Sequence, residues 1–430
     1  MTPRMRLLLR LGGWLGLVLA VSWACRIASP TTPATPDAQA TVAAAVQATL
    51  AAATGLAPQP TAPPTAQPTA VPTPALVAQP AYVWAYRDDT DALVLYDAQG
   101  QAVLSVPVSA EGLLFPVAPA HGLHTLAPIP PAGPYDMVVM AAGALHRDNK
   151  EMIRTLDAIS PGGSRTELRV DGDLAGIAGI PETPRVAYAV WHMVGYQYQS
   201  ALYVHTVGTA PPTRSLLEMR DDEGWGLLPV GMDTHGVWVT RAVSGAPLAP
   251  RGLSLVDFTG QEHPLLDATF VGLNPVAGWV AYSPAPGTLA WQPVQSAPTP
   301  ALVGNPVTVP EPVFPVDQGA IFIHAAFSSG YVAWQVHIGT PMEGRPYLRV
   351  YTLDGQPVAV QNDQGPDPAA DVFEGPPWTW VRTAAGQDYV VLGGRRQSDG
   401  QEVLLFVTPD LSQTVAVVPG HFMGVAYPAR

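Results

Sequence analysis

The residues of this chain that could bind a metal are few and poorly spaced for that task. His121 and His124 lie three positions apart, which suits two ligands on one helix face, but the surrounding sequence is a proline-rich loop. Four carboxylates follow one another in a second loop: Asp363, Asp367, Asp371 and Glu374. They lack the alternating spacing of a calcium-binding EF-hand loop, which favours a solvated acidic loop. We therefore predict no metal site and no cofactor.

The motifs of common catalytic sites are missing. The sequence contains no Gly-x-Ser-x-Gly nucleophile elbow, no Walker loop and no Gly-x-Gly-x-x-Gly phosphate fingerprint. Carboxylates are also sparse in the first strand of each predicted four-stranded repeat, which we expect to lie innermost in the fold. Glu182 and Asp233 are exceptions. We therefore expect a protein that is not an enzyme.

A second group of residues suits recognition better than reaction. These are aromatic or cationic side chains in or beside the longer connections between expected strands: His146, Arg147, Tyr196, Tyr198, Arg345, Trp378, Arg395 and Arg396. Variable loops on a rigid scaffold commonly carry function. We hypothesise that these residues contact a ligand or partner; the alternative is that they belong to ordinary solvated loops.

The only cysteine, Cys25, lies where an export signal would end. Three arginines precede an apolar run at residues 11–24, which is shorter than the roughly 20 residues of a membrane span and fits a secretory signal. The sequence Val-Ser-Trp-Ala-Cys resembles the lipobox of bacterial lipoproteins, which implies lipidation of Cys25. Ordinary cleavage with release, and an uncleaved anchor, are the alternatives. We assign residues 1–25 to a signal peptide and lipobox.

Residues 26–80 read as a disordered stalk rich in Ala, Thr and Pro. Within it, residues 36–54 can form a short helix whose apolar stripe is narrow, either a weak self-association element or a solvated part of the tether. The Pro-Thr repeats of residues 58–80 favour polyproline II, which at about 3.1 Å per residue spans on the order of 70 Å. Such a spacer would hold a folded body away from a membrane.

Composition limits the kinds of partner. The formal net charge is −13 and Lys150 is the only lysine, so the chain lacks the clustered cations that a nucleic-acid surface needs. Hydrophobic residues make up 47% of the chain, enough for a large core. A single cysteine excludes an intrachain disulfide.

The body, residues 81–430, is organised as repeats of four short strands. Residues 171–267 hold two consecutive units with the same internal order, each close to the period of a propeller blade. Third-strand signals such as LVLYDAQG and LSLVDFTG recur to the end of the chain. The fold class we predict is all-β, a seven-bladed β-propeller, with six or eight blades as alternatives.

The first repeat lacks its first strand, and the last segment reads as a first strand that no second, third or fourth strand follows. Residues 82–86 already read as a second strand, whereas residues 420–430, GHFMGVAYPAR, read as a leading strand with nothing after it. We predict that these two segments pair and close the propeller, because an open ring would expose two sheet edges.

Parts of the body are similar to TolB-like β-propellers. The segments SPGGSRTEL at residues 160–168 and VAYSPAPG at residues 280–287 echo the repeats of that family, as do VAYAV and LYVHT at the strands that begin at Val186 and Leu202. The resemblance covers residues 81–430 and implies a propeller fold.

Together these features predict an exported, membrane-anchored, non-catalytic binding protein. It would act at the outer face of the cytoplasmic membrane or outside the cell, and it would contact an extracytoplasmic protein or glycan through the long-loop face. The alternative is a propeller enzyme of the cell envelope, a glycan hydrolase or lyase that uses carboxylates in the central channel.

Overall fold

The computed structural model describes residues 79–107, 127–128 and 138–427, with internal gaps of which residues 311–319 form the longest. The predicted signal peptide and lipobox, and the stalk as far as residue 78, lie outside the described residues. Within the described ranges, no helix is long and apolar enough to cross a bilayer.

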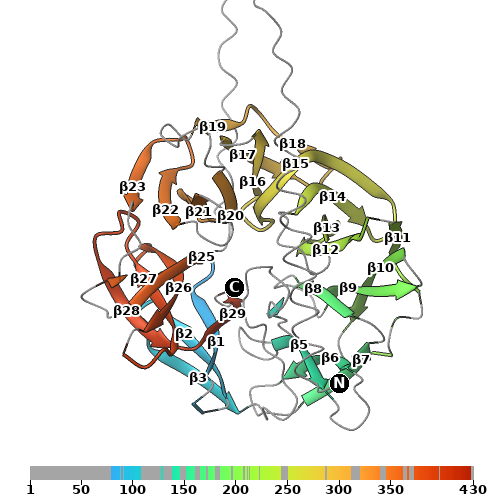
Figure 1. Ribbon diagram of the computed structural model, residues 1–430, viewed down its shortest axis with the longest axis horizontal. Coiled ribbons are helices and arrows are strands. Elements are labelled where there is room, and N and C mark those ends of the chain that lie inside the picture. Colours follow the sequence, from blue (N-terminus) through green and yellow to red (C-terminus); the bar gives the residue numbers. More distant parts are fainter. Residues whose placement is uncertain are drawn as a thin grey trace, which may run out of the picture. The chain divides into compact units, whose positions relative to one another are not determined.

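The described body is built entirely from antiparallel strands (Figure 1). One sheet has the order β29-β1-β2-β3, with β1 at Tyr82–Arg87, β2 at Ala92–Asp97, β3 at Ala102–Pro107 and β29 at His421–Ala426. The next has the order β4-β5-β6-β7, at Ala127–Pro128, Val138–Leu145, Met152–Ile159 and Arg165–Val170. A third contains β8 to β11, at Asp173–Gly179, Arg185–Val194, Gln197–Thr206 and Leu217–Asp221.

Three further sheets follow in the chain. The largest holds β12 to β19, at Trp225–Met232, Gly236–Val243, Arg251–Asp257, Glu262–Asn274, Trp279–Ala285, Thr288–Gln295, Ala301–Leu302 and Val307–Pro310. The sheet β20 to β23 lies at Ala320–Phe327, Tyr331–Ile338, Arg345–Thr352 and Pro357–Gln361. The last, β24 to β28, lies at Pro366–Asp367, Val372–Arg382, Asp388–Arg396, Glu402–Val407 and Thr414–Pro419.

The eight-stranded sheet consists of two four-stranded units joined by one long strand. The first half of β15, as far as Leu266, pairs with β14, whereas its second half, from Phe270, pairs with β16. Thr269 lies between the halves and pairs with both neighbours. From the sequence we expected two separate strands here.

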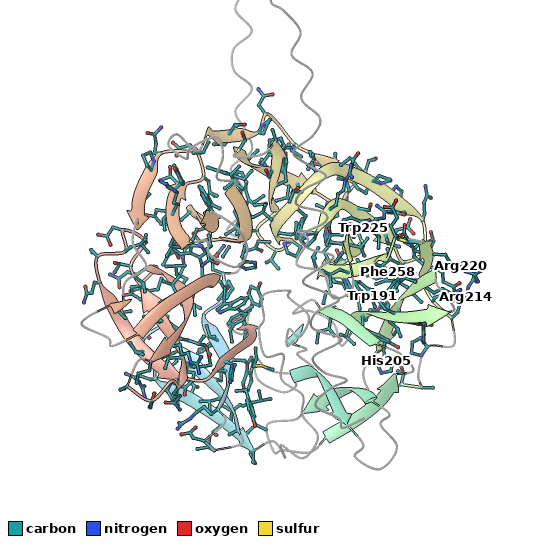
Figure 2. All side chains as sticks on the ribbon, viewed as in Figure 1. Trp191, His205, Arg214, Arg220, Trp225 and Phe258 are labelled. Carbon is teal, nitrogen blue, oxygen red and sulfur yellow. The ribbon has the colours of Figure 1, made fainter. Side chains whose placement is uncertain are left out.

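The sheets bury apolar side chains on both faces because neighbouring sheets pack against each other. Five of the six residues of β2 are buried, as are five of the six in β27. Indole N–H groups bond to backbone carbonyls across the sheet boundaries: Trp191 to Leu227 at 2.8 Å (Figure 2), Trp291 to Leu353 at 2.9 Å and Trp380 to Ala326 at 2.9 Å. These tryptophans therefore fill the space between sheets and satisfy their polar atom there.

The predicted pairing of the two ends of the body is confirmed. Strand β29 pairs antiparallel with β1, and Tyr82 lies opposite Ala426. The N–H of Ala81 donates to the carbonyl of Ala426 at 3.1 Å. Gly420 starts this return with φ near +125°, and a Cβ there would lie 2.6 Å from the carbonyl oxygen of Tyr86, so glycine is required. The first and last described strands thus complete one sheet.

Each sheet contacts the next one along the chain through its leading strand. Strand β8 packs against β12, β15 against β20, and β20 against β25. Further contacts join β27 to β29, β29 to β4, and both β4 and β5 to β8. The prediction of an all-β fold of several antiparallel four-stranded sheets is confirmed.

Candidate functional site

A cleft of about 560 Å³ opens between the sheet β20–β23 and the sheet β24–β28. Its lining comes from both sheets: Gly330, Tyr331, Thr352, Arg382, Gly386, Gln387, Asp388, Tyr389, Thr408, Pro409, Gln413 and Val415. The volume falls within the range of about 300–1,000 Å³ that is typical of small-molecule sites. The cleft is therefore large enough to hold a small molecule.

Four short turns form the walls of the cleft, and each is closed in the same way. A Ser or Thr hydroxyl accepts a hydrogen bond from a backbone N–H two to five residues later, at Ser328, Thr352, Thr383 and Thr408. Such local side-chain bonds are typical of turns that end a strand. Because these turns join the first to the second strand, or the third to the fourth, they all lie at one end of their sheets.

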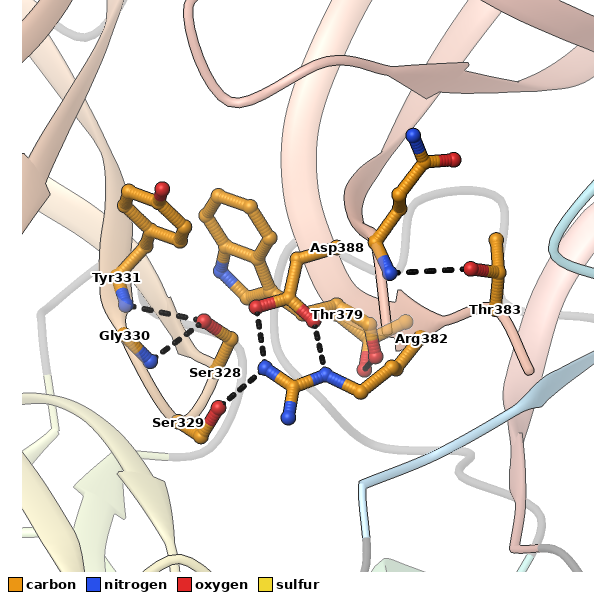
Figure 3. A network of polar contacts seen from close by, with 10 residues as sticks. Ser328, Ser329, Gly330, Tyr331, Thr379, Arg382, Thr383 and Asp388 are labelled. Carbon is orange, nitrogen blue, oxygen red and sulfur yellow. Dashed lines mark hydrogen bonds and ion pairs between the residues drawn. The ribbon is translucent and has the colours of Figure 1, made fainter. Parts of the chain in front are cut away.

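An ion pair between Arg382 and Asp388 forms part of the lining of the cleft, and Figure 3 shows its contacts. The Arg382 guanidinium donates to both carboxylate oxygens of Asp388, at 2.6 and 2.8 Å, and also to the hydroxyl of Ser329 in the neighbouring sheet. The Asp388 side chain is 5% exposed and that of Arg382 is 26% exposed. The hydrogen bond to Asp388 raises the pKa of Arg382 above its usual range. Through its bond to Ser329 the pair links the two sheets, and its two charges neutralise each other.

A tyrosine held by a buried tryptophan forms one wall. The ring of Tyr331 stacks on Trp380 with centroids 5.5 Å apart and planes 18° apart. Trp380 is 1% exposed and donates its indole N–H to the carbonyl of Ala326. The Tyr331 ring is therefore positioned before any ligand binds, which lowers the entropy cost of binding.

Several polar atoms of the lining have no hydrogen-bond partner among the described residues. They are the Tyr331 hydroxyl, the Gln413 amide, the Gln387 Nε2 and the Arg382 Nη1. The Gln387 Oε1 accepts from the Tyr389 hydroxyl at 3.1 Å, which orients that amide. These atoms offer both donors and acceptors to a molecule in the cleft.

The backbone at Arg382 also receives the incoming chain. Its N–H donates to the carbonyl of Pro80 at 2.8 Å. Gln79 is buried, and neither atom of its amide has a partner within the described part of the chain. The chain therefore enters the body at the end where the cleft opens, not at the end of the long connections where we expected binding.

Three of the predicted contact residues lie outside the described residues, namely His146, Arg147 and Tyr196, as does Cys25. Tyr198 lies near the start of β10 and Arg345 is the first residue of β22. Both positions adjoin connections between a second and a third strand, as the sequence predicts. Their role as contacts stays a prediction.

Arg395 and Arg396 lie at the end of β26, but their guanidinium groups bond within their own hairpin. Arg395 Nε donates to the carbonyl of Gly400 at 2.9 Å. Arg396 Nη1 donates to Asp399 at 3.1 Å and to Gln401 at 3.0 Å. Most of the geometry of these two side chains is therefore explained by closing the turn.

Trp378 does not lie beside a loop, and this corrects the expected position. It belongs to β25, where its ring stacks on Phe422 of β29 at 5.5 Å with planes 1° apart. A Cβ at Gly393 would lie 2.6 Å from its Nε1. His324 of β20 lies on it at 5.6 Å. Trp378 is thus a packing residue between sheets.

Within the described ranges, no group of three or more His, Cys, Asp and Glu residues is placed to hold a metal. The cleft was not expected from the sequence, because the longer connections were predicted to form the binding face. A signal was present: the second strands YVAW and YVVL both begin with tyrosine directly after a turn, at Tyr331 and Tyr389.

Comparison with known proteins gives only structural neighbours. No protein family matches the chain, and no curated protein does. The body is similar to prolyl oligopeptidase B from Galerina marginata, apo protein, with 11% identity and a TM-score of 0.40, over 80% of this chain and 52% of that one. A crystal structure of the eukaryotic initiation factor matches with 8% identity and a TM-score of 0.25, over 80% of this chain and 85% of that one. The chain thus spans about half of the oligopeptidase.

One expectation from the sequence is contradicted by this comparison. We expected a protein that is not an enzyme, whereas the structural neighbour named above is a prolyl oligopeptidase. We therefore withdraw that expectation. At 11% identity the likeness concerns the fold, and it assigns no reaction to this chain.

Two histidines make stability depend on pH. Burial lowers the pKa of His324 and of His205 below the ordinary value of 6.5. The folded state therefore favours the neutral imidazole, so this stabilisation is complete above pH 6.5 and decreases as the pH falls below it. We expect a smaller free energy of unfolding at pH 5 than at pH 7 in urea titrations, and a reduced difference in His324→Phe. The half-exposed His235, changed to Gln, is the control.

The carboxylates with lowered pKa values change the free energy of unfolding only at lower pH. They therefore do not obscure the effect of the histidines between pH 7 and 5. Turn hydrogen bonds lower the pKa of Asp257, Asp399 and Asp410 below the ordinary value of 3.8. Their stabilisation persists at pH 5 and is lost only as the pH falls below about 3.8. If His324→Phe keeps the full loss of stability between pH 7 and 5, His324 is not its source.

Proposed function

We propose that this chain is an exported, membrane-tethered binding protein whose body is a seven-bladed β-propeller. The strand pairings support seven four-stranded units when β15 is divided between two of them. The contacts between neighbouring sheets run through all seven units and return from the last to the first at β29. In this proposal β29 closes the ring of seven blades. Membership of the TolB-like family stays a separate prediction.

The tether and the cleft share one end of the body. Ala81 and Ala426 are hydrogen-bonded to each other, and Pro80 bonds to Arg382 in the cleft lining. The stalk of residues 26–80 therefore joins the body beside the cleft. The proposed export signal and Cys25 lipid would tether the body to the membrane through this stalk.

The observation that carries the binding function is the cleft itself. It combines a tyrosine fixed by a buried tryptophan, a neutralised ion pair and several polar atoms that lack partners among the described residues. Its ligand is an extracytoplasmic protein or glycan. Tyr198 and Arg345 remain predicted contacts of a second surface, at the opposite end of the sheets.

A photoreactive residue at position 413 tests this function in intact producing cells. Gln413 is exposed and lines the cleft, whereas Gln356 is exposed at the end of the turn that begins at Thr352 and is not itself a lining residue. We expect a specific adduct from position 413 and none from position 356. Equal adducts at both positions, or none at either, would refute the cleft as the binding site.

The anchor is tested separately by replacing Cys25 with Ser. We expect the wild-type protein in the membrane fraction, with an intact mass raised by acyl chains at Cys25. The variant should lose the acyl mass and should not be processed at that position. A wild-type mass without acyl chains, or a variant that still carries the acyl mass, would contradict lipidation of Cys25.

A further inference from the structure

We infer that the cleft between the sheets β20–β23 and β24–β28 binds a neutral saccharide. The inference rests on the proposed binding function and names the class of ligand for the same site. Three properties of the lining support it: its charge, the state of its backbone groups and the kind of side chains that remain available.

The charge of the lining favours a neutral ligand. Arg382 and Asp388 are the ionisable acid and base of the lining, and they bind each other through two hydrogen bonds. The other lining residues are Gly, Thr, Tyr, Gln, Pro or Val. An anion or a cation would lose its hydration on entry without gaining an unpaired counter-charge.

The backbone of the walls disfavours an extended peptide. Peptides that add to a sheet need a free strand edge with unpaired N–H and C=O groups. Here the walls are turns whose backbone groups bond to one another, as in Ser328 N–H to Tyr331 O at 2.8 Å and Thr383 N–H to Gln387 O at 2.9 Å. Thr408 N–H likewise donates to Gln413 O at 3.0 Å. Recognition must therefore come from side chains.

The available side chains match sugar hydroxyls. An amide presents a donor and an acceptor side by side, as does each hydroxyl of a sugar ring. Gln413 and Gln387 provide such groups, and the Tyr331 hydroxyl adds another. The flat Tyr331 ring, held by Trp380, offers an apolar surface to the C–H face of a pyranose.

Binding of three neutral oligosaccharides to the full chain in detergent tests this inference. The probes are chitohexaose, cellohexaose and maltohexaose, measured by titration calorimetry and by the change in tryptophan fluorescence. An oligogalacturonate serves as the charged comparison, and a peptide with the sequence of residues 58–80 serves as the peptide comparison.

We expect at least one neutral sugar to bind and neither comparison to do so. Loss of one hydrogen bond in Gln413→Ala or Gln387→Ala should weaken binding about fivefold. Both residues are exposed, so neither change should affect folding. Gln356→Ala, outside the lining, should bind as the wild type does.

Failure of this inference is distinguishable from failure of the proposed function. If none of the neutral sugars binds, if the comparisons bind in their place, or if the Gln variants bind as tightly as the wild type, the saccharide assignment is overturned. A specific adduct from position 413 in the same protein would then leave the binding function standing. If no neutral sugar binds and position 413 gives no specific adduct, both the saccharide assignment and the proposed binding function are overturned.

Discussion

Deletion of residues 420–430 is expected to unfold the body, not merely to fray its end. Strand β29 buries Met423 and Ala426 and covers Trp84 and Tyr86 of the neighbouring strand, all of which are less than 4% exposed. Full burial of a large apolar side chain contributes about 1.5–3 kcal/mol. Loss of this burial for Met423, Trp84 and Tyr86 therefore costs on the order of 6 kcal/mol, close to the 5–15 kcal/mol that typically stabilises a whole domain.

The measurement is thermal unfolding followed by circular dichroism. A shorter deletion of residues 428–430 keeps β29 intact and is the matched control. We expect the control to melt as the wild type does, and the longer deletion to lose its cooperative transition. An unchanged melting temperature after the longer deletion would refute the role of β29 in stabilising the body.

The pairing of β29 with β1 was predictable from the sequence because it follows from counting strands. The first repeat starts with the second-strand signal YVWAY, and the segment after Pro419 has the pattern of a leading strand without followers. Pairing them leaves no strand without a neighbour. The structure confirms this pairing at Tyr82 and Ala426.

Other strand boundaries depend on packing that the sequence does not display. The repeat boundary predicted at residue 267 implied a break, yet β15 continues through it because its two halves pair with different neighbours. Similarly, the segment Glu374-Gly375-Pro376-Pro377 reads as a loop. Strand β25 passes through it by means of register shifts at Glu374/Pro377 and Pro377/Thr379, which are bulges that tolerate proline. That is why Trp378 was expected beside a loop.

The cleft was not predictable in the same way. Its walls come from turns separated by as many as 85 positions, between Gly330 and Val415, and their proximity results from the packing of two sheets. Each turn, taken alone, shows only the Ser or Thr that closes it. The neutralised pair of Arg382 and Asp388 lies within one hairpin, but its contact with Ser329 of the other sheet appears only in the fold.

Replacement of Trp380 is expected to have the second large effect, because this side chain joins the two sheets that form the cleft. It packs with Ala333 and Leu348 of one sheet and with Val390 and Leu405 of the other. Trp380→Ala should lower the free energy of unfolding by about 3–5 kcal/mol in urea titrations. The exposed Val103, changed to Ala, should alter it by less than about 0.5 kcal/mol.

Trp380→Phe separates the hydrogen bond from the volume. It keeps an aromatic ring against Tyr331 but leaves the buried carbonyl of Ala326 without its indole donor, which costs about 1–3 kcal/mol. Because the ring that supports Tyr331 remains, binding in the cleft should weaken less in Trp380→Phe than in Trp380→Ala. If Trp380→Phe is as stable as the wild type and Trp380→Ala loses less than about 1 kcal/mol, this tryptophan does not hold the two sheets together, and the rigid wall of the cleft must have another cause.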